Sequence, residues 1–193
     1  MNWSNLSNIT SKSFKCGYCG NPIASNQGFL AKRNYNQRDS IVGKIYICHH
    51  CTKPTFFDDK EVQTPGVLAG NFVNHITIEN IEKIYDEARK CFSIGAFTSS
   101  VMCCRKLLMN ISVSEGAKEG LGFVDYVNYL NDNNYIPPNG KKWVDSIRKL
   151  GNEANHKIDF KSKEDALRII NFTEMLLRFI YELPGIMKIS EES

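Results

Sequence analysis

Apolar residues recur at helical spacing in the second half of the chain. After Thr77, the residues Ile81, Tyr85, Ala88 and Phe92 follow one another at intervals of three or four. This spacing puts them on one face of an α-helix. Gly95 then stands where a left-handed cap ends a helix. The same spacing predicts two further helices, over about Thr98–Ser112 and about Gly122–Asn133.

Two more helices complete the pattern. One begins shortly after Pro138 and runs to His156, with Trp143, Ile147, Leu150 and Ala154 on its apolar side. The other begins at Ser162-Lys-Glu-Asp165, which resembles a capping box, carries an apolar stripe from Ala166 to Tyr181, and is expected to end at Pro184-Gly185. Five helices over residues 77–186 predict a compact helical bundle, followed by a short tail at 187–193.

The first half of the chain lacks helical periodicity. Residues 1–13 are rich in Ser and Asn and predict a loose lead-in. Within residues 14–57, Lys44–Ile47 reads as a strand and Gly28–Tyr35 could supply another. Residues 58–76 contain Pro65, Gly66 and Gly70 and predict a linker. We therefore expect a mainly α fold, with a small N-terminal β unit before the bundle.

Two CxxC pairs punctuate the β unit. Cys16 and Cys19 form the first, and Cys48 and Cys51 form the second, with 28 residues between the pairs. Two such turns supply the four tetrahedral ligands that a structural zinc ion needs, and a four-cysteine site is closed to catalytic water. The pattern predicts a zinc ribbon. A redox dithiol, or His49 or His50 in place of one cysteine, are the alternatives.

A basic stretch lies between the two pairs. It contains Lys32, Arg33, Tyr35, Gln37 and Arg38. Cations with an interleaved aromatic ring can follow a phosphate backbone and stack a base, so we identify a candidate RNA or DNA contact here. A merely solvated loop is the competing interpretation.

Composition narrows the setting of the protein. The net charge of +3 is too small to indicate nucleic-acid binding by itself. No apolar run is long enough for a membrane span, and the N-terminus lacks the pattern of a signal peptide. Seven cysteines without an export signal predict a cytoplasmic protein, in which Cys91, Cys103 and Cys104 act as small apolar residues.

The fourth helix carries a polar row opposite its apolar side. Arg148, Asn152 and His156 are spaced at i, i+4 and i+8, which aligns them on one stripe. A cation, an amide and an imidazole in this order can serve acid–base chemistry on a phosphate ester. The same residues can also simply end a helix, because a protonated histidine is favoured at its C-terminus.

The bundle resembles a known family. The resemblance covers about residues 78–185 and is to the domain of unknown function numbered 4145, which is often preceded by a CxxC…CxxC ribbon. It rests on the segments Ile84–Phe92, Gly95–Thr98, Val101–Leu107, Tyr129–Leu130, Ile136–Pro138, Ile147–His156 and Tyr181–Pro184.

That family is similar to the HEPN superfamily of helical domains. The resemblance implies a HEPN-like bundle that forms homodimers, with a role in a prokaryotic, phage-defence-type system and a protein partner there. Active HEPN members are metal-independent ribonucleases that carry an Arg, four to six residues and then a His.

The HEPN motif is incomplete in this sequence. His156 matches the motif histidine and Asn152 matches the polar residue after the motif arginine, but Gly151, Leu150 and Lys149 occupy the three allowed arginine positions. Arg148 lies one residue too far away, and Met109 stands where an acidic residue is often found. We therefore expect a binding module for nucleic acid or a partner protein. The alternative is a divergent endoribonuclease that uses His156, Arg148 and Asn152 in a dimeric groove.

Overall fold

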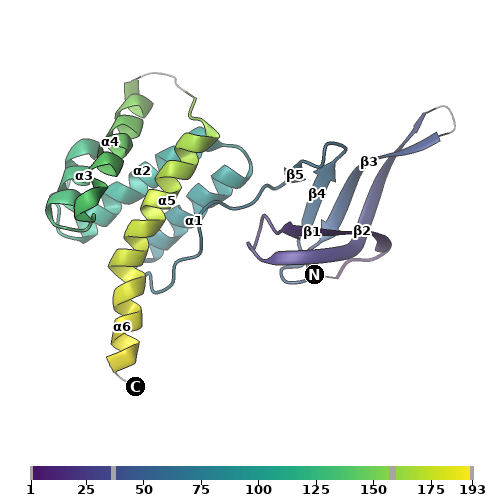
Figure 1. Ribbon diagram of the computed structural model, residues 1–193, viewed down its shortest axis with the longest axis horizontal. Helices are drawn as coiled ribbons and strands as arrows, with labels where there is room; N and C mark the ends of the chain where they lie inside the picture. Colours follow the sequence, from purple (N-terminus) through teal and green to yellow (C-terminus); the bar gives the residue numbers. More distant parts are fainter. Residues whose placement is uncertain (1, 36–37, 157–159, 192–193) are drawn as a thin grey trace. The chain divides into compact units, whose positions relative to one another are not determined.

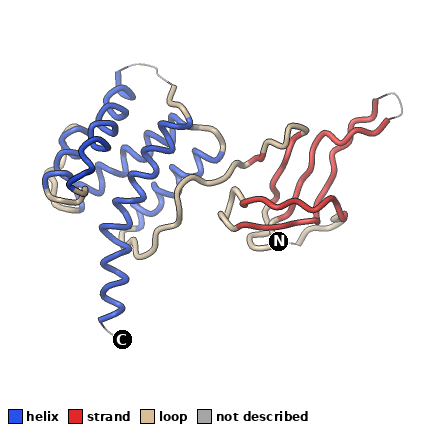
Figure 2. The backbone as a smooth tube through the Cα atoms, viewed as in Figure 1, coloured by secondary structure: helices blue, strands red, loops and turns tan. Residues whose placement is uncertain are grey.

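The chain folds into two units. The computed structural model describes residues 2–35, 38–156 and 160–191, with side chains in these ranges except at 34–35, 38–39, 139, 141, 150–156 and 189–191. The first unit ends at Leu68 and contains a β sheet, and the second begins at Ala69 and is helical (Figures 1 and 2). The fold is therefore an N-terminal antiparallel sheet followed by a helical unit.

The sheet is an antiparallel meander. Its strands follow chain order, and each pairs with the next. They are β1 (Ser7–Lys15), β2 (Pro22–Tyr35), β3 (Arg38–Ile47), β4 (Pro54–Asp58) and β5 (Gln63–Thr64).

Residues 7–13, which we expected to be a loose lead-in, form most of β1. The prediction failed because this strand is polar, and only Ile9 within it is buried. Its register also shifts between Asn8 and Lys12, which breaks the alternation that sequence reading depends on. The strand is held by its partner β2 and by Tyr46, whose hydroxyl donates to the Thr10 carbonyl over 2.8 Å.

The sheet unit buries two small apolar clusters. Ile9, Tyr46 and Phe57 form one, where Tyr46 and Phe57 meet edge to face with ring centroids 5.8 Å apart. The other is built from Cys16, Cys48 and Ile23. The packing at this end of the sheet therefore depends directly on cysteine side chains.

The helical unit contains the five helices that the apolar spacing predicts. The last of them is continuous through a π-helical turn, so its parts carry three labels. The helices are α1 (Glu79–Ser93), α2 (Phe97–Ser114), α3 (Phe123–Asp132), α4 (Lys141–His156), and α5 (Lys163–Leu177) with η2 (Arg178–Glu182) and α6 (Leu183–Glu191). A short 3₁₀ turn, η1 (Pro138–Gly140), leads into α4.

Two predicted helix boundaries are formed by the expected chemistry. Gly95 has a φ of +80°, and the N–H groups of Gly95 and Ala96 donate to the carbonyls of Phe92 and Cys91, which closes α1 with a Schellman motif. At the start of α5, the Ser162 side chain accepts from the Asp165 N–H, and the Asp165 side chain accepts from the Ser162 N–H.

We predicted that the last helix ends at Pro184-Gly185. This prediction is wrong, because the helix continues to Glu191. The π-helical turn immediately before Pro184 widens the helix, and such a turn accommodates a proline that a regular α-helix would exclude. α6 thus extends past the ends of the other helices (Figure 1).

The core of the helical unit is centred on α2. Val101, Cys104, Leu107, Leu108 and Ile111 are each completely buried, as their spacing predicts. Cys91 and Cys103 are half-buried. Within the described residues, no helix is long and apolar enough to cross a membrane.

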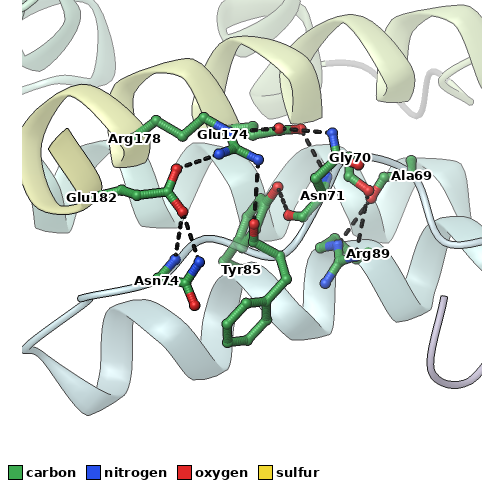
Figure 3. Close-up of polar contacts among 10 residues, drawn as sticks. Ala69, Gly70, Asn71, Asn74, Tyr85, Arg89, Glu174, Arg178 and Glu182 are labelled. Carbon is green, nitrogen blue, oxygen red and sulfur yellow. Dashed lines mark hydrogen bonds and ion pairs between the residues drawn. The ribbon is translucent and has the colours of Figure 1, made fainter. Parts of the chain in front are cut away.

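Residues 69–76, which we had assigned to the linker, form an extended strap along α1 and the last helix. Ala69 and Val73 are buried in the helical core. Arg89 Nε donates to the Ala69 carbonyl over 3.0 Å, and the Tyr85 hydroxyl donates to the Asn71 carbonyl over 2.9 Å (Figure 3). The strap is therefore part of the bundle.

Two carboxylates fasten the strap to the last helix. Glu174 accepts from the backbone and side-chain amides of Asn71 over 2.8 and 3.0 Å, and Glu182 accepts from both amides of Asn74 over 3.0 Å (Figure 3). Arg178 lies between the two carboxylates and bonds to both. Burial acts to raise the pKa of Glu174, but the hydrogen bonds from Asn71 and Arg178 outweigh it and lower the pKa below its ordinary value.

The contacts of the strap make the stability of the helical unit sensitive to low pH. Because the folded-state pKa of Glu174 is depressed, its contribution is complete above the ordinary value of 4.5 and is lost as pH falls through the folded value. We expect Glu174→Gln to lower the free energy of unfolding at neutral pH by about 1–3 kcal/mol and to weaken the loss of stability in acid.

Denaturant unfolding followed by helical circular dichroism, at several pH values, measures this effect. Glu119→Gln, at an exposed loop position, is the matched control and should behave like the wild type. Equal acid sensitivity in the Glu174→Gln variant and the wild type would contradict the assignment.

Candidate functional site

The four cysteines of the CxxC pairs converge at one end of the sheet. Their sulfur atoms all lie within 4.8 Å of one another. The Sγ atoms of Cys16 and Cys51 are 3.7 Å apart, as are those of Cys19 and Cys48. A tetrahedral zinc ion with Zn–S bonds of about 2.3 Å separates its sulfur ligands by about 3.8 Å. The cluster could hold a metal ion, and its spacing is consistent with zinc.

The two CxxC turns fold in the same way. In each turn, the backbone N–H of the first cysteine donates to the carbonyl of the residue five positions later. The backbone N–H of the residue after the second cysteine donates to the carbonyl of the first cysteine. These bonds are Cys16 to Asn21 and Gly20 to Cys16, both 2.9 Å, then Cys48 to Lys53 at 3.1 Å and Thr52 to Cys48 at 2.8 Å. The residue after the second cysteine has a left-handed backbone conformation in both turns, with φ of +72° at Gly20 and +56° at Thr52. The glycine after the first pair therefore meets a real conformational requirement.

Both cysteines of the first turn accept hydrogen bonds at sulfur, but burial still raises the pKa of Cys16 above its ordinary value. The Tyr18 N–H donates to Cys16 Sγ over 3.4 Å, and the Asn21 side chain donates to Cys19 Sγ over 3.5 Å. Burial acts to raise the pKa of Cys19, but the bonds from Asn21 outweigh it and lower the pKa to about 7. Burial raises the pKa of the Cys51 thiol to about 12. Cys19 is therefore the easier of these two thiols to ionise for a metal.

Residues outside the pairs hold the turns in place. A Cβ at Gly17 would lie 2.4 Å from the carbonyl oxygens of Pro65 and Gly66, so only glycine fits the first turn. The Trp3 indole donates to the Thr52 carbonyl over 2.7 Å, which anchors the start of the chain to the second turn. Within the described residues, neither His49 nor His50 joins the group of converging ligands.

The basic stretch forms the outer part of a long β hairpin. β1 pairs with β2 only up to Gly28, and β4 pairs with β3 only from Gly43 onward, so the strands beyond these points pair with each other alone (Figure 1). We call residues 31–35 and 38–41 the ribbon. Lys32 and Arg33 are exposed on it. The register pairs Tyr35 with Arg38 at its end.

The predicted polar row is only partly described. The backbone of α4 runs through Arg148, Asn152 and His156, but the side chains of Asn152 and His156 lie outside the described residues. Arg148 is fixed within the bundle. Its Nη1 donates to Asp145 Oδ1 over 2.9 Å, and its Nη2 donates to the side-chain oxygen of Asn128 on α3. Two of the nitrogens that could hold a phosphate are thus already engaged.

One aromatic residue lies where the sequence did not predict it. We expected Trp143 on the apolar side of α4, but its side chain is 48% exposed. Ile147, which we had placed on that side, is 1% exposed, and Val144, which we had not, is also 1% exposed and fills the position expected for Trp143. The spacing of Val144 and Ile147 was the one feature of the sequence that indicated the buried face of α4. The large apolar side chain of Trp143 made the neighbouring face look like the buried one.

A family match covers most of the helical unit. The profile described as "Domain of unknown function (DUF4145)" matches residues 86–190, which is more than half of the chain. The chain belongs to the DUF4145 family. The DUF4145 match begins within α1 and ends within α6, so the four-cysteine cluster and the strap both lie outside it. Comparisons with curated proteins and with solved structures gave no match to this DUF4145 protein.

The cluster predicts that the sheet unit depends on its metal. We expect the purified protein to contain one zinc ion per chain and Cys48→Ser to lose it, because the remaining thiols leave an incomplete tetrahedron. In a Trp143→Phe background, the emission of Trp3 should shift to the red in Cys48→Ser and after chelation.

Elemental analysis and the emission spectrum check this prediction. Cys103→Ser, at a half-buried position in the helical unit, should keep both the metal and the spectrum. Full metal content in Cys48→Ser would show that the four thiols are not the ligands.

Proposed function

We propose that this protein is a nucleic-acid-binding module in which a structural zinc ion holds the sheet and the ribbon contacts RNA or DNA. The observation that carries the proposal is the two-stranded extension of β2 and β3 beyond the rest of the sheet. A two-stranded ribbon is one of the elements that enter the major groove of duplex DNA. From Ala31 to Tyr35 the ribbon spans about 14 Å, more than the groove depth of about 8.5 Å.

The charge of the ribbon supports the proposal. Between Leu30 and Ile41 the sequence carries three cations, Lys32, Arg33 and Arg38, against the single acid Asp39. Cations on an exposed ribbon gain affinity by releasing counterions from phosphates. Tyr35 adds a ring that can stack on an unpaired base.

The cysteine cluster lies at the base of this ribbon. β2 begins three residues after Cys19, and β3 ends immediately before Cys48. An isolated two-stranded hairpin is marginally stable in water, so the ribbon needs a fixed base. A zinc ion on the four thiols would supply it, which gives the metal a role in binding without any contact to the nucleic acid.

The contacts of Arg148 argue against catalysis by the polar row of α4. An endoribonuclease using His156 needs a free cation on the scissile phosphate, whereas Arg148 is bonded to Asp145 and Asn128. The resemblance to HEPN domains adds the expectation of a prokaryotic, phage-defence setting. It does not by itself predict catalysis, which depends on the side chains that this sequence carries.

The ribbon predicts salt-dependent binding. We expect the wild type to bind a short duplex, and the Arg33→Ser/Arg38→Ser variant to bind about tenfold more weakly at moderate salt. The slope of log Kd against log salt concentration should fall by about 1.8, since each lost phosphate contact removes about 0.9. Fluorescence anisotropy with labelled duplex DNA, duplex RNA and single-stranded RNA measures both effects.

Lys60→Ser is the matched control for this experiment. Lys60 is exposed in the turn between β4 and β5, outside the ribbon, and its loss should leave affinity and slope unchanged. Unaltered binding by the double ribbon variant would sink the proposal. Cleavage of the single-stranded RNA in EDTA, abolished by His156→Ala, would favour the endoribonuclease instead.

We also propose that the helical unit forms a homodimer. Phe179, Leu183 and Ile186 are 49%, 51% and 51% exposed along the outer side of η2 and α6, where α6 leaves the bundle. A contiguous apolar stripe of this kind commonly marks a protein–protein contact. Two copies packed along these helices would cover it.

Leu183→Glu should therefore convert a dimer into a monomer without altering helical content, because it introduces a charge into the centre of the stripe. Sedimentation velocity measures the change. Ile94→Glu, at a residue that is 69% exposed at the end of α1, should remain dimeric. A monomeric wild type would refute this arrangement.

A further inference from the structure

A groove lies between α4 and α5 on the surface of the helical unit. Its volume is about 540 Å³, which is within the range of small-molecule sites. The floor includes Ile147 and Phe172, both of which are nearly fully buried. The groove is also lined by Lys142, Trp143, Ser146, Arg168, Asn171 and Met175.

Trp143 exposes its ring at this groove. With Val144 and Ile147 filling the core, burial of the helix does not require the indole, and nearly half of its surface is left in water. Exposing this much apolar area costs about 25 cal/mol per Å² relative to burial. A planar ligand that stacked on the ring would recover that free energy.

Three polar side chains at the groove are without protein partners among the described residues. Within the part of the chain that the structure describes, no hydrogen bond or ion pair is made by the side chains of Lys142, Ser146 or Asn171. Arg168 has only a long contact to Asp165, at 3.9 Å. Polar groups that converge on an apolar floor without partners are typical of a site that fixes the orientation of a ligand.

The charge of the lining selects the kind of ligand. Both charged residues that line the groove, Lys142 and Arg168, are cations, and no acid lines it. A phosphate suits both, since arginine binds it through two N–H groups and lysine as a point charge. The hydroxyl of Ser146 and the amide of Asn171 can both donate and accept, as the edge of a nucleobase requires.

We propose that this groove binds a nucleotide, with its base stacked on Trp143 and its phosphate held by Lys142 and Arg168. The nucleotide is either free or the unpaired end of a strand, because both present the same ring and phosphate. The site is in the helical unit, and it does not depend on nucleic-acid binding by the ribbon.

The emission of Trp143 tests the proposal directly. In the full chain with Trp3→Phe, we expect adenosine monophosphate to quench the remaining tryptophan in a saturable manner. Adenosine and inorganic phosphate, added separately, should each bind about tenfold more weakly or worse, which corresponds to at least about 1.4 kcal/mol for each missing half. A single-stranded pentanucleotide with a free end distinguishes the two sources: tighter binding than the mononucleotide indicates a strand end.

Two variants identify the residues responsible. Lys142→Ser/Arg168→Ser should weaken the mononucleotide about tenfold and leave adenosine unaffected. Lys163→Ser, which removes an exposed cation from the first turn of α5 outside the groove, is the control and should bind as the wild type. Calorimetry with Trp143→Leu should show loss of both ligands, while helical circular dichroism verifies that the variant folds.

The Arg33→Ser/Arg38→Ser variant separates this site from the ribbon, because it should bind the mononucleotide normally. Absence of quenching by any nucleotide would overturn the proposal. So would binding that is unaffected by both the cation and the Trp143 variants. If emission changes only with protein concentration, a second copy covers the groove and the nucleotide assignment is wrong.

Discussion

The convergence of four thiols at one point is the constraint around which the sheet unit is built. The unit buries two apolar clusters of three residues each, and one of them includes Cys16 and Cys48. A unit of 68 residues with so small a core has little hydrophobic free energy to set against the entropy of the chain. A metal bound to the cluster would add its binding free energy directly to folding. Every strand of the meander, and the ribbon at its far end, would then rest on that ion.

The helical unit is held together by a different balance. Its apolar core is large and continuous and stabilises the fold. Its polar side chains therefore serve mainly to hold the strap against the helices. The carboxylates of Glu174 and Glu182 are placed where the strap presents amides that would otherwise be unpaired. Arg178 between them keeps two acids close without mutual repulsion. The strap therefore has defined partners along its course, although its sequence has no regular pattern.

Sequence reasoning reached the features that depend on local spacing. The two CxxC pairs, the stripe from Val101 to Ile111 and the capping box at Ser162 each follow from residues a few positions apart, and the structure contains all three. It did not reach features that depend on distant partners. β1 is polar and exists because β2 and Tyr46 hold it. Trp143 was expected inward because tryptophan is apolar, whereas the packing of α4 is decided by Val144 and Ile147. Pro184 was expected to end a helix that a π-helical turn allows to continue.

The strap also fixes where the helical domain begins as a physical object. The DUF4145 match starts at Asp86, but Ala69 and Val73 are as deeply buried as residues of the helices themselves. A fragment that begins at Asp86 would lack the strap and the first seven residues of α1. Ile170 and Glu174 would then be exposed to water where the strap covers them in the full chain. The boundary of this folding unit therefore lies before residue 69, some distance upstream of the boundary drawn by sequence similarity. In this protein the family match and the compact helical unit begin at different residues.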